Sequence, residues 1–198
     1  MDSSVFDAHA IILAGGRGKR MGTDKTALKI GDETLVERLI RVLAPLFKGV
    51  LVGTSRSLSD PIQEVRYISD RKPGMGPLMA IYSCLEASPS PVNFVVACDI
   101  PEVNISLIRH LLSFAEEYEI VTPSFRQGFP EPLFAVYNRS VLPVLKKQLD
   151  TDQLKTSNCL QQCNTKIVPI KDDTWYHNLN TPQDYTIYME KRKRDLYE

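Results

Sequence analysis

The sequence predicts a single-domain α/β protein of the Rossmann-like type, with a mostly parallel, twisted sheet covered by helices on both faces. Short runs rich in β-branched residues alternate with segments of helical apolar spacing along nearly the whole chain. This alternation is typical of sheets built from strand–helix–strand units with right-handed crossovers. No repeat, linker or low-complexity tract interrupts it, so residues 1–198 are expected to form one domain.

The apolar pattern assigns a set of strands and helices. The expected strands are 10–13, 50–52, 65–68, 92–97, 120–122, 133–137 and 166–170, and the expected helices are 33–47, 77–87, 103–118, 140–149 and one that begins at Thr181. The helix at 33–47 is expected to pair Glu37 with Arg41 on its outer face. The last helix has an N-cap threonine, Pro182 at its first position and Asp184 in its first turn.

Composition excludes several classes of protein. Lys plus Arg and Asp plus Glu are both 24, so the formal net charge is zero and a broad electrostatic hold on nucleic acid or an acidic membrane is not expected. Apolar runs are too short for a transmembrane helix, and the start MDSSVFDAH has no secretory signal, so a cytoplasmic location is expected. Cys84, Cys98, Cys159 and Cys163 lack metal-site spacing and are interpreted as reduced thiols.

Polar residues follow three of the predicted strands. Strand 10–13 leads into GGRGKRMGTDK, strand 65–68 into Asp70 and the turn GMGP, and strand 92–97 into Asp99 within CDIP. Ligands of open α/β sheets bind outside the carboxyl ends of the strands, so these segments are expected to meet at one edge.

The glycine-rich loop is suited to an anion. Gly15 and Gly16 let a ligand approach backbone N–H groups. The cations of Arg17, Lys19, Arg20 and Lys25 are candidate phosphate ligands. Taken alone, a turn with solvated charges explains the loop as well. A P-loop requires a glycine, four further residues and then Gly-Lys, but Gly22 is followed by Thr23, and Lys25 follows Asp24, so this motif is excluded. The dinucleotide fingerprint fails because Met21 stands where its third glycine is required.

Asp99 is the natural magnesium ligand, since Mg²⁺ prefers carboxylate oxygen and is usually held by one or two carboxylates plus substrate phosphates. A turn aspartate is the alternative for this residue. Asp70 has a weaker claim, as a base or ribose contact.

Five blocks of the chain carry a resemblance to a known family. Five segments occur in this order between Leu13 and Tyr185: LAGG-x-x-x-R-M-G-x-D-K, DRKPGMGPL, CDIP, EPLFAVY and NLNTPQDY. Together they resemble the molybdenum cofactor guanylyltransferase family, and this resemblance implies a fold of the nucleotidyltransferase type. Gly18, where the family often has serine, and Met79-Ala80, where it commonly has a glycine, depart from that pattern without removing a charge or a ligand.

The resemblance implies that GMP is transferred from Mg-GTP to the phosphate of molybdopterin or its molybdenum form, with release of pyrophosphate. It also implies roles for individual residues: nucleotide binding by Leu13, Ala14, Gly15, Gly16, Lys25, Asp70 and Asp99, catalysis by Lys25, Arg20 and Asp99, magnesium binding by Asp99, and contact with the pterin side by Asn178 and Asn180. Other cofactor-assembly proteins or molybdoenzyme apoproteins would be its protein partners.

Two alternatives stay open at this point. One is a related nucleotidyltransferase that uses CTP or a sugar or alcohol phosphate; Gly15 beside Gly16 favours a purine donor by resemblance, because relatives that use pyrimidines tend to have alanine there. The other is a GTP-binding adaptor without turnover. Asn180 could equally be a turn residue that precedes the last helix.

Overall fold

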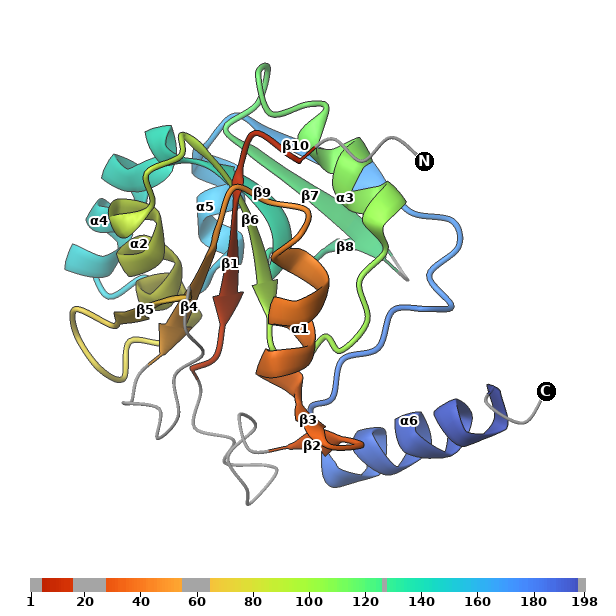
Figure 1. Cartoon of the computed structure of the whole chain (residues 1–198). Coiled ribbons are helices and arrows are strands. Elements are labelled where there is room, and N and C mark those ends of the chain that lie inside the picture. The colour runs from red at the N-terminus through yellow and green to blue at the C-terminus, as the bar shows by residue number, and fades with distance from the viewer. Residues whose placement is uncertain (1–4, 16–27, 55–64, 126–127, 196–198) are drawn as a thin grey trace.

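The centre of the molecule is an eight-stranded sheet with the order β10-β7-β9-β6-β1-β4-β5, and β8 pairs with β7 outside this path (Figure 1). We describe it from a computed structural model, which covers residues 5–15, 28–54, 65–125 and 128–195. The strands are β1 (His9–Leu13), β4 (Val50–Thr54), β5 (Arg66–Ser69), β6 (Val92–Ala97), β7 (Ile120–Phe125), β8 (Phe129–Pro130), β9 (Phe134–Asn138) and β10 (Thr165–Pro169).

Most of the sheet is parallel, as the sequence predicted. β1 pairs in parallel with β4 and β6, β4 with β5, and β7 with β10, whereas β9 runs antiparallel to both β6 and β7. The four strands β6-β1-β4-β5 therefore point their carboxyl ends in one direction, and this common edge is where the sequence places its polar segments.

Helices cover both faces of the sheet. The described helices are α1 (Leu35–Leu43), α2 (Pro77–Ala87), α3 (Ile105–Leu112), α4 (Leu142–Asp150), α5 (Ser157–Gln162), α6 (Pro182–Asp195) and the short 3₁₀ turn η3 (Arg139–Val141). Alternate residues of β1 belong to different cores: Ala10 and Ile12 pack with α1 and α3, and Ile11 and Leu13 with α2, α4 and α5. The fold expected from the sequence is confirmed.

The start of α1 differs from the expectation. A small hairpin, β2 (Lys29–Ile30) with β3 (Glu33–Thr34), precedes the helix. Thr34 then forms a capping box: its hydroxyl accepts from the Glu37 N–H at 3.2 Å, and the Glu37 carboxylate accepts from the Thr34 N–H at 2.6 Å. The predicted Glu37–Arg41 pair is therefore wrong, and Arg41 donates instead to Glu33 at 2.7 Å.

The last helix, α6, lies away from the sheet and beside the β2-β3 hairpin (Figure 1). Its N-cap is the one predicted, because the Thr181 hydroxyl accepts from the Asp184 N–H at 3.1 Å and the Asp184 carboxylate accepts from the Thr181 N–H at 2.8 Å. Leu179 and Tyr188 form a small core with Ile30 and Leu35. None of the described helices has the length and apolar character needed to cross a membrane.

Candidate active site

The described residues that follow β1, β5 and β6 lie at one carboxyl edge of the sheet. Backbone hydrogen bonds extend the strand pairing past the ends of the strands: the Ala14 N–H donates to Gly53 O at 2.8 Å, the Cys98 N–H to Leu13 O at 3.1 Å, and the Asp70 N–H to Thr54 O at 3.3 Å. Leu13 and Ala14 are each only 4% exposed. The nucleotide contact expected of their backbone stays a prediction.

Asp99 and Asp70 occupy different parts of this edge. Asp99 follows β6 and Asp70 follows β5, with β1 and β4 between them. Strands lie about 4.8 Å apart, so three spacings separate the two segments by roughly 14 Å. One metal ion cannot be shared across that distance, whereas an extended nucleotide could reach from one carboxylate toward the other.

The Asp70 carboxyl is half-buried, and burial raises its pKa above the ordinary value. Its Oδ1 atom is buried and has no hydrogen-bond partner in the part of the chain that the structure describes. A buried carboxylate oxygen of this kind is suited to a donor that arrives with a ligand, such as a hydroxyl or an N–H group.

Asp99 fits a magnesium ion by its chemistry and its position. Its Oδ1 atom is also buried, and it stands beside the end of β1, where the glycine loop starts. Among the residues that the structure describes, no group of three His, Cys, Asp or Glu side chains could hold a metal by itself. Because Mg²⁺ is commonly held by few carboxylates and completed by substrate phosphates and water, one aspartate is a sufficient protein ligand here.

The segment before α6 closes over this edge. The Leu179 N–H donates to the backbone oxygen of Asp99 at 2.8 Å, so the neighbouring Asn178 lies close to the candidate metal ligand. Asn178 Oδ1 is buried without a hydrogen bond from any described residue. Asn180 is exposed, and its N–H donates to Asp184 at 3.1 Å as part of the start of α6. Both asparagines therefore flank the residue that is bonded to Asp99, and Asn178 is the one with a buried amide oxygen.

A pocket of 390 Å³ opens next to Asn178. Its walls come from the end of β7, from β8, from the segment before α6 and from the first half of α6, and they include Phe125, Phe129, Glu131, Tyr176, Asn178 and Tyr188. Phe129 is 71% exposed. The pocket combines aromatic surface with carboxylate and amide groups, which suits a flat, polar-edged molecule.

Sequence reasoning gave no role to Glu131 or Tyr176. The Tyr176 hydroxyl donates to Glu131 Oε2 at 2.6 Å, although the two residues are 45 positions apart. Glu131 falls within the block EPLFAVY that contributed to the family resemblance, and that was the available signal. Nothing in the sequence indicated its partner.

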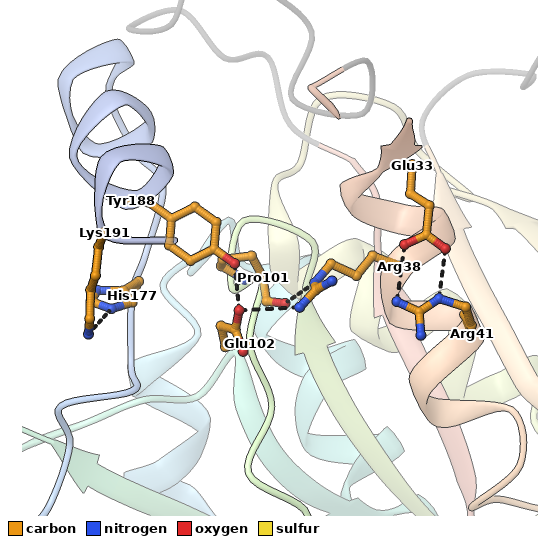
Figure 2. A network of polar contacts seen from close by, with 8 residues as sticks. All are labelled: Glu33, Arg38, Arg41, Pro101, Glu102, His177, Tyr188 and Lys191. Carbon is orange, nitrogen blue, oxygen red and sulfur yellow. Dashed lines mark hydrogen bonds and ion pairs between the residues drawn. The ribbon is translucent and has the colours of Figure 1, made fainter. Parts of the chain in front are cut away.

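A second polar network supports the loop that follows Asp99 (Figure 2). Arg38 of α1 donates to Pro101 O and to Glu102 Oε1, both at 3.2 Å. The Tyr188 hydroxyl of α6 donates to the same Glu102 oxygen at 2.6 Å. The loop is therefore tied to α1 on one side and to α6 on the other.

Other expected site residues lie outside the described part of the chain. These are Gly16, Arg17, Lys19, Arg20 and Lys25. Their roles remain those that the sequence suggests.

At the carboxyl edge of a mostly parallel sheet lie two separated aspartates and the start of a glycine-rich sequence. This arrangement is typical of a nucleotide-binding α/β protein. The family of MobA-like NTP transferase domains matches residues 10–164. The chain belongs to this family and is a nucleotidyltransferase, as its five sequence blocks indicated.

Individual relatives agree with this assignment. The chain is 30% identical over 185 residues to a probable molybdenum cofactor guanylyltransferase of Carboxydothermus hydrogenoformans, covering 88% of this chain and 91% of that protein. It is 29% identical over 194 residues to a protein of the same description from Peptoclostridium acidaminophilum, covering 91% and 88%.

Solved structures share the fold. The molybdopterin-guanine dinucleotide biosynthesis protein A of Archaeoglobus fulgidus superposes with a TM-score of 0.82 at 24% identity, over 94% of this chain and 99% of that chain. The 2-C-methyl-D-erythritol 4-phosphate cytidylyltransferase of Thermus thermophilus gives a TM-score of 0.72 at 16% identity, over 95% and 100%. At these identities the likeness concerns the fold alone.

Proposed function

We propose that this nucleotidyltransferase transfers GMP from GTP to the terminal phosphate of molybdopterin or its molybdenum-loaded form, and so makes a guanine dinucleotide cofactor. The observation that carries the proposal is the juxtaposition of Asp99 with the segment of Asn178 through the 2.8 Å hydrogen bond between Leu179 N–H and Asp99 O. It brings a phosphate-side carboxylate and an acceptor-side amide together at the edge where the glycine loop begins.

In the donor half of the proposed site, the backbone of Leu13, Ala14, Gly15 and Gly16 would contact the nucleotide, Asp70 would bind the nucleoside, and Lys25 and Arg20 would bind its phosphates, as the family resemblance implies. The unpartnered Oδ1 of Asp70 supports a hydrogen bond from a ribose hydroxyl or a guanine N–H. Mg²⁺ at Asp99 would neutralise charge on the nucleotide phosphates.

The chemistry calls for positioning more than for a protein base. An oxygen of the acceptor phosphate attacks the α-phosphorus of GTP, and the bond to pyrophosphate breaks. That oxygen is already ionised, so cations that bring two anions together supply most of the assistance. His9 and His110 fit this view, because His9 bonds to Ser90 at the opposite end of β1, and His110 of α3 packs against Phe114, which follows that helix.

The names of the relatives support the choice of acceptor. The Carboxydothermus hydrogenoformans and Peptoclostridium acidaminophilum proteins are each described as a probable molybdenum cofactor guanylyltransferase, and the alignments cover most of both chains. The pocket beside Asn178, with its aromatic walls and its carboxylate, is suited in size and polarity to a pterin. Proteins of cofactor assembly, or molybdoenzyme apoproteins, would then receive the product.

The experiment is a pyrophosphate-release assay with purified protein, Mg²⁺ and molybdopterin, with GTP, CTP and ATP in separate reactions and controls without acceptor. Release with GTP and acceptor alone is the expected result. Release with CTP would retain the chemistry and overturn the guanine assignment. A protein that binds GTP and releases pyrophosphate only with a sugar or alcohol phosphate would overturn the acceptor, and GTP binding without turnover on any acceptor would favour an adaptor.

A further inference from the structure

Glu131 is held in a way that fixes what each of its oxygens does. Oε1 accepts from the Leu133 N–H at 3.1 Å, and Oε2 accepts from the Tyr176 hydroxyl at 2.6 Å. The backbone around it is held as well, since its N–H donates to Pro123 O at 2.9 Å and its own carbonyl accepts from the Phe134 N–H at 3.0 Å. The carboxylate is therefore a fixed acceptor for Tyr176.

Tyr176 has little freedom to turn away from this partner. Its ring stacks on Phe125, with centroids 4.1 Å apart and planes inclined by 15°. Burial, and then the charge of Glu131, raise the pKa of the hydroxyl, so it keeps its proton and donates it to the carboxylate. Toward any other neighbour the hydroxyl has only lone pairs, and it must act as an acceptor.

That neighbour is Asn178. Its side chain shares a hydrogen bond with the Tyr176 hydroxyl. Because Asn178 Oδ1 accepts no hydrogen bond from the described residues, the amide group that faces the phenolic oxygen is Nδ2. The other amide atom, Oδ1, then points elsewhere; it is buried and accepts no hydrogen bond from the described residues.

A buried amide oxygen without a donor is unfavourable unless a ligand supplies one. Asn178 directly precedes Leu179, whose N–H donates to Asp99 O. Asn178 also lines the pocket, together with Leu179. The missing donor is therefore expected on the acceptor molecule and not on the phosphates of the donor nucleotide, which carry only acceptor oxygens.

We propose that Glu131 and Tyr176 are positioning residues that orient the Asn178 amide, so that its oxygen accepts a hydrogen bond from a ring N–H of the pterin acceptor. The inference rests on the proposed function for the identity of the acceptor. In this chain of hydrogen bonds, Leu133 N–H and the Tyr176 hydroxyl both donate to Glu131. Asn178 Nδ2 donates to the Tyr176 oxygen, which leaves Asn178 Oδ1 for the ligand.

Glu131→Gln tests the direction of this chain. Leu133 N–H keeps the glutamine oxygen as its acceptor, so the glutamine NH₂ faces Tyr176 and donates to it. The hydroxyl must then donate to Asn178, whose amide turns over and presents Nδ2 to the acceptor. Asn178 Nδ2 and the ring N–H of the pterin, both of them donors, would then face one another. Tyr176→Phe instead removes the partner of Nδ2 and leaves the amide unrestrained.

The experiment measures KM for molybdopterin, KM for GTP and kcat in Glu131→Gln, Tyr176→Phe and Asn178→Ala, alone and combined. Each single variant is expected to raise KM for molybdopterin about tenfold and to leave KM for GTP within about twofold. Because the two positioning residues act through Asn178, neither should raise KM further in the Asn178→Ala background.

Two controls separate positioning from general damage. Tyr82→Phe removes another tyrosine–glutamate contact, between Tyr82 and Glu86 on α2 at 3.4 Å, and should leave all three parameters unchanged. Trp175 is the one tryptophan of the chain and lies 5.9 Å from the Tyr176 ring, so its fluorescence reports molybdopterin binding without turnover.

The outcomes are distinguishable. Wild-type protein that neither binds molybdopterin nor turns it over would overturn the proposed function and this inference with it. Active wild-type protein with additive effects of Tyr176→Phe and Asn178→Ala, or with an unchanged molybdopterin KM in both positioning variants, would overturn the inference alone.

Discussion

The backbone oxygen of Asp99 accepts a hydrogen bond from the N–H of Leu179, 80 positions further along the chain, at 2.8 Å. Asp99 closely follows β6, and Leu179 belongs to the segment that leads into α6. In the proposed function, this contact joins the donor half of the site to its acceptor half. A displacement of either segment would change the distance between the two substrates, on which the rate of an in-line transfer depends.

The first prediction concerns Asp99. Asp99→Asn should abolish metal-dependent turnover, with a fall in kcat of about 10²- to 10³-fold or more, because an amide oxygen lacks the charge that Mg²⁺ requires of a lone protein ligand. Pyrophosphate release at several Mg²⁺ concentrations measures the effect. The melting temperature should stay that of the wild type, since the Leu179 contact uses the backbone of Asp99.

Asp150→Asn is the matched control for charge. Asp150 ends α4 and pairs with Lys146 at 2.8 Å, and its substitution should leave turnover unchanged. Turnover of Asp99→Asn at the wild-type rate would place the metal elsewhere.

The second prediction concerns Asp70, whose pKa is raised by burial above 3.8. The folded protein holds this proton to higher pH than the unfolded chain, so the contribution to stability is complete below about 3.8 and is lost as the pH rises through the folded pKa. At neutral pH the ionised carboxylate therefore opposes folding. Asp70→Asn should raise the melting temperature at neutral pH and should lose this advantage near the unfolded pKa.

The same substitution should weaken GTP binding by about tenfold, through loss of a charged hydrogen-bond acceptor. Melting curves across acid and neutral pH and a GTP titration measure the two effects. Asp150→Asn again serves for comparison, because the hydrogen bond from Lys146 lowers the pKa of Asp150 and its replacement should not stabilise the protein. A destabilised Asp70→Asn protein would contradict the prediction.

Much of the fold follows directly from the sequence. The bounds of β6 (Val92–Ala97) and α2 (Pro77–Ala87) match the predicted ranges. A continuous apolar run is typical of a buried strand, and Pro77 marks the first position of the helix. The positions of Asp70 and Asp99 follow from the rule that parallel strands share one carboxyl edge. Short-range patterns and one topological rule were sufficient for this half of the site.

The remainder depends on contacts that local patterns do not contain. The hairpin β2-β3 has two-residue strands, too short for any periodicity. Glu37 could pair along the helix or cap it, and the cap was preferred because it satisfies two backbone N–H groups with no helical partner. The bond between Tyr176 and Glu131 depends on how the segment before α6 folds back onto the sheet, which the sequence does not indicate.

The third prediction concerns the network around Glu102 (Figure 2). The Arg38 side chain is 17% exposed and that of Glu102 is 38% exposed, and Tyr188 donates to the same carboxylate. Glu102→Gln should destabilise the protein by about 1–2 kcal/mol, because a largely buried guanidinium loses its charged partner. Urea denaturation measures the change.

Glu33→Gln is the control for an exposed ion pair. Glu33 and Arg41 form an ion pair with the side chains 37% and 57% exposed, and water replaces such a pair at little loss. Its substitution should have a much smaller effect on the urea midpoint than Glu102→Gln does. Equal midpoints for the two variants would show that the Glu102 network does not stabilise the fold.

The fourth prediction tests the close packing behind the glycine loop. Gly53 lies in β4, its carbonyl accepts from the Ala14 N–H at 2.8 Å, and a Cβ atom added to it would lie 2.8 Å from Cys84 Sγ. Cys84 is fully buried in α2, so neither group can move away freely. Gly53→Ala should therefore destabilise the protein by about 1–3 kcal/mol through overpacking.

The partner substitution gives this prediction a sharper form. Cys84→Ala removes the sulfur that an added methyl group would meet, and alone it should destabilise by leaving a small cavity. In the double variant the methyl group introduced at position 53 occupies part of that space. The loss of unfolding free energy should then be smaller than the sum of the two single losses by about 1 kcal/mol or more. Additive losses would mean that the strand shifts instead, and the Ala14 backbone with it, which would appear as weaker GTP binding in Gly53→Ala.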